Sequence, residues 1–116
     1  MSAPQARPGE TVARLAATVE ARRGADPETS WTARLLARGP EACAKKFGEE
    51  AVEAVIEAAR GDPDRLAAEA ADALYHLLVM CAARGVTLAR IEDELARREG
   101  VSGVAEKAAR GAGESG

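Results

Sequence analysis

The chain has 116 residues, a net charge of −3, and 30% charged against 47% apolar residues. This length predicts one domain, and the acidic balance excludes a nucleic-acid binder that relies on positive charge. Aromatic residues make up only 3% of the chain, which also excludes a surface that stacks single-stranded bases. The two cysteines, Cys43 and Cys81, are too few for a disulfide scaffold and are expected to be buried free thiols.

The chain carries no segment that predicts export or membrane insertion. Its first nine residues contain two prolines and a glycine and have no apolar core of the kind found in signal peptides. The longest apolar run, residues 77–83, is far shorter than the roughly 18–20 residues that span a membrane. We therefore expect a cytoplasmic protein without membrane or nucleic-acid partners.

Alanine is abundant, β-branched residues are sparse, and no segment alternates apolar and polar side chains, so the sequence predicts an all-α fold. Asp-Pro pairs, a threonine and glycines mark starts and stops of helices. About five helices are expected, over residues 10–23, 26–38, 40–60, 63–84 and 88–99. Residues 1–9 are expected to form a flexible arm and residues 111–116 a flexible tail, leaving a single domain over residues 10–110. Because alanine-rich helices bury little area, the helical bundle is expected to complete its core by dimerisation.

Two pairs of acidic residues lie on the third and fourth expected helices. Glu50 and Glu53 are three residues apart, as are Glu69 and Asp72, so each pair shares one helix face. The short link at residues 61–62 makes the two helices an antiparallel hairpin. Counting from the midpoint of that link places the two acidic pairs at nearly the same level. If the faces meet, four carboxylates converge.

Alanine, valine and leucine surround both pairs, so the two helices are expected to be largely buried. Clustered carboxylates in such surroundings repel each other and lose hydration, and a divalent cation would compensate. All-oxygen ligands favour Mg²⁺, with Mn²⁺ as a substitute, over Zn²⁺. A solvated acidic face remains the alternative. A di-iron site would need a Glu-x-x-His motif on two helices, and His76 is the sole histidine.

Lys46 precedes Glu50 by four residues and extends the acidic face toward the start of its helix. It is expected either to form an ordinary ion pair with Glu50 or to contact a phosphate beside the metal. His76 follows Asp72 by four residues and shares its face, where a structural role is favoured over metal ligation.

The acidic segments resemble the metal motif of the all-α NTP pyrophosphatase superfamily. They read Glu49-Glu50-Ala51-Val52-Glu53 and Glu69-Ala70-Ala71-Asp72. Further segments resemble the phosphoribosyl-ATP pyrophosphatase family of histidine biosynthesis, namely residues 30–36, 39–41, 45–53, 69–78 and 102–110. The resemblance extends over about residues 10–110, and Trp31 stands where that family is expected to have tyrosine or another aromatic residue.

The resemblance implies Mg²⁺-dependent hydrolysis of 1-(5-phosphoribosyl)-ATP to 1-(5-phosphoribosyl)-AMP and pyrophosphate. It implies that the metal ligands are Glu50, Glu53, Glu69 and Asp72. Glu49 would be a further ligand or the base that orients the attacking water, and Lys46 would hold the pyrophosphate.

The same resemblance implies a homodimer or larger oligomer with its site near the subunit interface. The candidate substrate contacts are Ser30, Trp31, Thr32, His76, Lys107 and Arg110. Two other functions stay open at this point. A house-cleaning pyrophosphatase of free or damaged nucleotides would use the same acidic motif, whereas a non-catalytic helical dimerisation module would not need it.

Overall fold

The computed structural model describes residues 7–100 and 110–111 of the chain. Its elements are all helices, which confirms the predicted fold class. They are α1 (Glu10–Ala21), α2 (Trp31–Ala37), α3 (Pro40–Arg60), α4 (Pro63–Ala83) and α5 (Leu88–Arg98). The predicted substrate contact Lys107 and most of both predicted terminal segments lie outside the described residues, and Arg110 is exposed.

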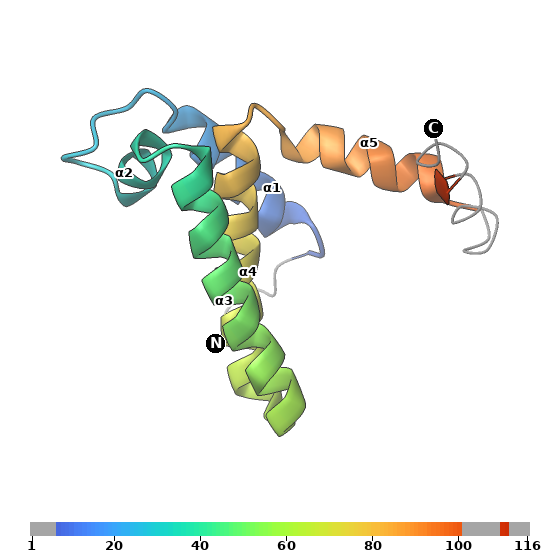
Figure 1. The fold of residues 1–116 in the computed structure, drawn as a ribbon. Coiled ribbons are helices and arrows are strands. Elements are labelled where there is room, and N and C mark those ends of the chain that lie inside the picture. Colours follow the sequence, from blue (N-terminus) through green and yellow to red (C-terminus); the bar gives the residue numbers. More distant parts are fainter. Residues whose placement is uncertain (1–6, 101–109, 112–116) are drawn as a thin grey trace, which may run out of the picture.

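The antiparallel pair of α3 and α4 forms the axis of the molecule, with its tight turn at one end (Figure 1). The turn is possible because Gly61 ends α3 with a φ of 78°, in the left-handed region that glycine adopts freely. Asp62 then starts α4, since its side chain accepts hydrogen bonds from the backbone N–H groups of Asp64 and Arg65. These local signals fix the antiparallel register that the sequence predicted.

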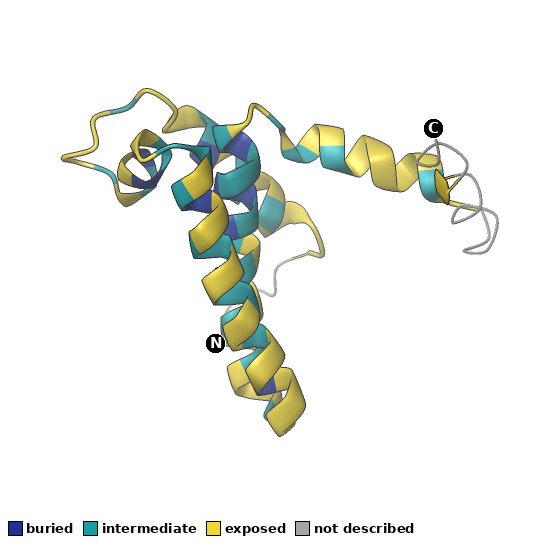
Figure 2. Ribbon diagram, in the orientation of Figure 1, coloured by how far each residue is buried: buried dark blue, intermediate teal, exposed yellow. Residues whose placement is uncertain are grey.

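The hydrophobic core lies at the other end of this hairpin, where α1 and α2 pack against it. Figure 2 shows buried residues gathered there, while the end with the turn is mostly exposed. The buried cluster consists of Val19, Leu35, Cys43, Leu78, Val79 and Ala82. Cys43 is a buried free thiol, as predicted, whereas Cys81 is only half-buried.

The predicted start of the second helix at Asp26-Pro27 is wrong, because these residues form a turn. The Asp26 carboxylate accepts a hydrogen bond from the Glu28 N–H, and the Asp26 carbonyl accepts one from Thr29. The helix begins only at Trp31, where the Ser30 hydroxyl accepts a hydrogen bond from the Ala33 N–H. The Asp-Pro pair therefore closed a local turn, and the serine became the N-cap.

The expectation that α3 and α4 are largely buried is wrong for the single chain. Val52 and Val55 on α3 are 56% and 66% exposed. Helix α5 extends away from the bundle in Figure 1, and its Leu95 is also exposed. The isolated chain thus leaves much apolar surface uncovered.

Helix α4 is long and apolar enough, by length and composition alone, to cross a membrane. It is also the helix against which α1, α2 and α3 all pack. Glu69, Asp72 and the buried His76 lie within it. A central bundle helix has the same composition, so this property adds little support for a membrane location.

Candidate metal centre

The α3–α4 hairpin brings three of the four predicted ligands together. Glu50, Glu69 and Asp72 each offer a carboxylate oxygen, and these atoms lie within 4.8 Å of one another. This is the convergence that the hairpin register predicted. Glu53 is exposed and lies outside this closest group. We call Glu50, Glu69 and Asp72 the carboxylate cluster.

The electrostatics of the cluster favour a bound cation. Loss of hydration raises the pKa of Glu69, and the nearby charges of Asp72, Glu53, Glu50 and Glu57 raise it further. Glu53 is therefore close enough to act on the cluster. The three carboxylate oxygens lie close enough together that small side-chain movements would let them hold one hard divalent cation. The donor set therefore fits a hard divalent cation.

Lys46 supplies the positive charge nearest to the cluster in the described part of the chain. Its Nζ lies 3.3 Å from Glu50 Oε1, which is the ion pair that one of the two sequence readings expected. The lysine side chain remains 38% exposed. It can therefore still contact a bound anion.

Sequence reasoning gave Glu57 no role, yet its carboxylate is the most buried acid of α3. The residue is 7% exposed, and its Oε2 atom is buried without a hydrogen-bond partner. Only Oε1 has a nearby cation, with Arg60 Nη1 at 3.6 Å. Its spacing of four residues from Glu53 and seven from Glu50 is the signal that would have placed it on the cluster's face.

His76 is buried on α4. Its ring meets the Tyr75 ring edge-on, with the centroids 4.9 Å apart. Burial lowers the pKa of His76, and the positive charge of Lys46 lowers it further. The negative charges of Glu50 and Asp72 partly offset this by raising the same pKa. The imidazole is thus biased toward its neutral form beside the cluster.

The predicted substrate contacts at residues 30–32 have distinct surroundings. Ser30 caps α2. The Thr32 hydroxyl is hydrogen-bonded to the Tyr75 hydroxyl at 2.5 Å, which ties α2 to α4. Trp31 is half-exposed, with the Arg34 and Arg38 guanidinium groups 6.0 and 5.8 Å from its ring centroid. Only Trp31 of these three presents a large free surface.

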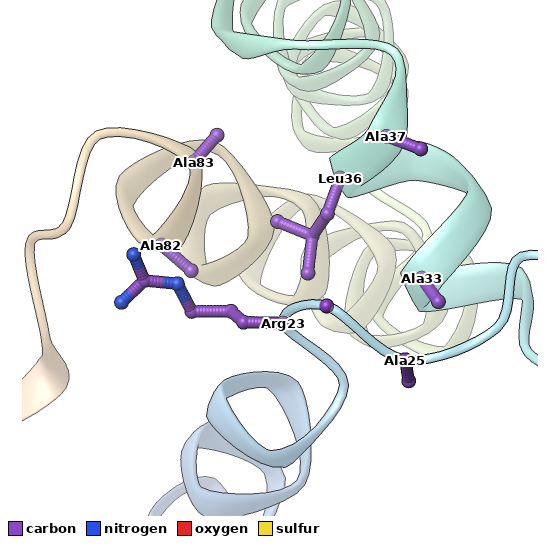
Figure 3. A pocket seen from close by; sticks show the side chains of 8 residues that line it. Arg23, Ala25, Ala33, Leu36, Ala37, Ala82 and Ala83 are labelled. Carbon is purple, nitrogen blue, oxygen red and sulfur yellow. The ribbon is translucent and has the colours of Figure 1, made fainter.

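Two hollows flank α2. One, of about 350 Å³, runs between α2 and α3 and is lined by Trp31, Arg38, Lys45, Lys46 and Glu49 among others. The other, of about 230 Å³, is shown in Figure 3. It is lined by Arg23, Leu36 and several alanines, and no lining residue is a carboxylate. The first hollow, which we call the cationic groove, borders the cluster because Lys46 lines it and is paired with Glu50.

These features define an all-α protein with a carboxylate centre suited to a divalent cation. Residues 12–99 match the family described as phosphoribosyl-ATP pyrophosphohydrolase. A phosphoribosyl-ATP pyrophosphatase of Cereibacter sphaeroides is 78% identical over 98 residues, covering 84% of this chain and 95% of the relative. Proteins of the same name from Paracoccus denitrificans and a Jannaschia species are each 71% identical, covering 84% and 83% of this chain and 90% and 94% of the relatives.

The chain therefore belongs to the phosphoribosyl-ATP pyrophosphohydrolase family. It is accordingly an enzyme, a hydrolase of a phosphoanhydride bond. This membership confirms the resemblance that the acidic segments carried.

Proposed function

We propose that the protein hydrolyses 1-(5-phosphoribosyl)-ATP between its α and β phosphates, giving 1-(5-phosphoribosyl)-AMP and pyrophosphate, in cytoplasmic histidine biosynthesis. The observation that carries the proposal is the carboxylate cluster, with its three oxygens within 4.8 Å, in a chain of this family. Phosphoanhydride hydrolysis needs charge neutralisation and an oriented water more than covalent chemistry. Lys46 and a cation held by the carboxylates would neutralise phosphate charge, and a neighbouring carboxylate would orient the water.

Glu50, Glu69 and Asp72 would hold Mg²⁺, with Glu53 completing the set from the exposed side. When bound, Mg²⁺ would neutralise and orient the phosphate oxygens next to the scissile bond. Mn²⁺ is expected to substitute, because it takes the same oxygen ligands.

Lys46 and Glu49 would act on the substrate and the water. The Lys46 ammonium lies between Glu50 and the cationic groove, where it would bind the departing pyrophosphate. Glu49 is exposed and lines the same groove. That location, outside the carboxylate cluster, supports its role as the base that orients water rather than as a further ligand.

The test is pyrophosphate release from phosphoribosyl-ATP, with ATP and dCTP assayed alongside, each with Mg²⁺ and with EDTA. Release from phosphoribosyl-ATP far above both free nucleotides, abolished by EDTA, is the expected result. Release mainly from a free nucleotide would contradict the proposal and favour a house-cleaning pyrophosphatase. A folded protein with no release from any of the three would also contradict the proposal.

We further propose that the protein works as a homodimer or larger homo-oligomer. The exposed apolar residues of α3 support this proposal. Sedimentation should show a dimer or larger species, and Val55→Glu should shift it toward the monomer. Ala21→Glu, at the exposed end of α1, is the control. A monomeric wild-type protein with full activity would contradict the proposal.

A further inference from the structure

The cationic groove contains more positive charge than its surroundings neutralise. Arg38, Lys45 and Lys46 line it together with a single carboxylate, Glu49. Lys46 is paired with Glu50. Within residues 7–100, by contrast, no carboxylate lies within ion-pair distance of Arg38 or Lys45. These two cations are therefore free to bind an anion.

Trp31 holds one of these cations in place. The Arg38 guanidinium lies 5.8 Å from the centroid of the Trp31 ring, a cation–π geometry that restricts a long side chain. The neighbouring Arg34 lies 6.0 Å from the centroid of the same ring, and its Nε also donates a hydrogen bond to the Pro27 carbonyl. Arg38 thus presents a planar, positioned donor at the groove, and such a donor suits a phosphate group.

The groove adjoins the candidate metal centre without being part of it. Its two free cations come from the end of α2 and the first half of α3, whereas the carboxylate cluster lies farther along α3 and on α4. Lys46 is the residue common to both regions. A ligand whose scissile phosphates lie at the carboxylates would therefore reach the groove with a different phosphate.

We propose that Arg38 and Lys45 form a subsite for a terminal phosphate of the substrate, with Trp31 as the positioning residue for Arg38. This inference rests on the proposed function, because it takes the substrate from there. Two groups of that substrate share the required chemistry. They are the 5′-phosphate of the phosphoribosyl group and the terminal phosphate of the leaving pyrophosphate, both multiply charged at neutral pH.

The fluorescence of Trp31 provides a direct test, since it is the single tryptophan of the chain. Metal-free protein is titrated with ribose 5-phosphate, with pyrophosphate and with ribose. Wild type should respond to at least one phosphate compound and should not respond to ribose. Arg38→Gln and Lys45→Gln should each weaken that response by about 10-fold to 100-fold, the loss of one charge-assisted contact. Arg84→Gln, an exposed arginine outside the groove, is the control and should leave it unchanged.

The titrations with ribose 5-phosphate and with pyrophosphate identify which phosphate of the substrate the subsite binds. Loss of ribose 5-phosphate binding in both variants assigns the subsite to the phosphoribosyl end, and loss of pyrophosphate binding alone assigns it to the leaving group. A wild-type protein that responds to neither phosphate compound, or unchanged affinities in both variants, would overturn the inference.

Turnover separates this inference from the proposed function. A wild-type enzyme that does not hydrolyse phosphoribosyl-ATP refutes the function, and the titration then decides the subsite by itself. A wild-type enzyme that does hydrolyse it, with variants that keep the full kcat/KM, refutes the subsite while the function stands. For a true subsite, both variants lower kcat/KM for phosphoribosyl-ATP, and Arg84→Gln does not.

Discussion

Removal of one carboxylate from the cluster should have opposite effects with and without metal. Asp72 is exposed, and its charge raises the pKa of Glu69, so the two carboxylates repel each other in the metal-free protein. Asp72→Asn removes this repulsion and keeps the side-chain shape. The melting temperature of the metal-free variant should therefore equal or exceed that of the wild type.

The same variant should lose most of its stabilisation by Mg²⁺. The three cluster oxygens lie within 4.8 Å, close to the spacing that a single ion needs. When the free Mg²⁺ concentration is about twenty times its dissociation constant, an ion that binds only the folded state stabilises that state by about 1.8 kcal/mol. For a domain of this size that is roughly 7–14 °C in melting temperature.

A lost ligand should weaken Mg²⁺ binding by at least the roughly 10-fold to 100-fold typical of outer-shell partners. At the same Mg²⁺ concentration the stabilisation then falls below about 0.7 kcal/mol, or roughly 5 °C. Differential scanning fluorimetry with Mg²⁺ and with EDTA measures both shifts. Asp93→Asn, an exposed aspartate on α5, is the matched control. A full Mg²⁺ shift in Asp72→Asn, or an equal loss in Asp93→Asn, would refute the reasoning.

Three further predictions address the lysine, the histidine and the core. Lys46→Gln should lower kcat/KM for phosphoribosyl-ATP by about 10-fold to 100-fold, because a charge-assisted contact is lost. Unchanged kinetics in a pyrophosphate-release assay would remove Lys46 from the site. Burial lowers the pKa of His76 below 6.5, so the unfolded chain binds a proton that the folded chain does not. The neutral, buried His76 therefore adds to the free energy of unfolding above about pH 6.5. That stabilisation is lost as the pH falls through the lowered folded-state pKa of His76. Urea unfolding at several pH values should show the decline in the wild type and a weaker one in His76→Gln, and identical profiles would contradict it. Leu35 is 3% exposed, so Leu35→Ala should cost about 2–5 kcal/mol of unfolding free energy. A loss below about 1 kcal/mol in urea unfolding would show that the core is packed less tightly there.

The fold class and the carboxylate cluster could be predicted from the sequence because both depend on local rules. Helix periodicity places acids three residues apart on one face, and the Gly61-Asp62 turn fixes how two such faces meet. Glu50 and Asp72 were therefore paired correctly from chain positions alone. The position of Glu53 relative to the cluster could not be predicted, since it depends on how far the side chain turns toward α4.

Local rules also produced the error at the start of α2. An aspartate before a proline can cap a helix or close a turn, and both use the same hydrogen bond from the side chain. At Asp26 the chain must bend between α1 and the hairpin, and the turn was formed. The helix instead begins at Trp31 after the Ser30 N-cap, and its Leu35 packs into the core.

By itself, the sequence determined the helices, the hairpin and the acidic chemistry between them, because hydrogen bonding and side-chain spacing within about twenty residues fix all three. Only the tertiary structure decided which side chains from distant positions share a surface. It buried the Glu57 carboxylate and joined Trp31, Arg38 and Lys45 into one groove beside Lys46. The physical reason is that burial and charge balance are properties of packed surfaces, which arise only when separate helices come together.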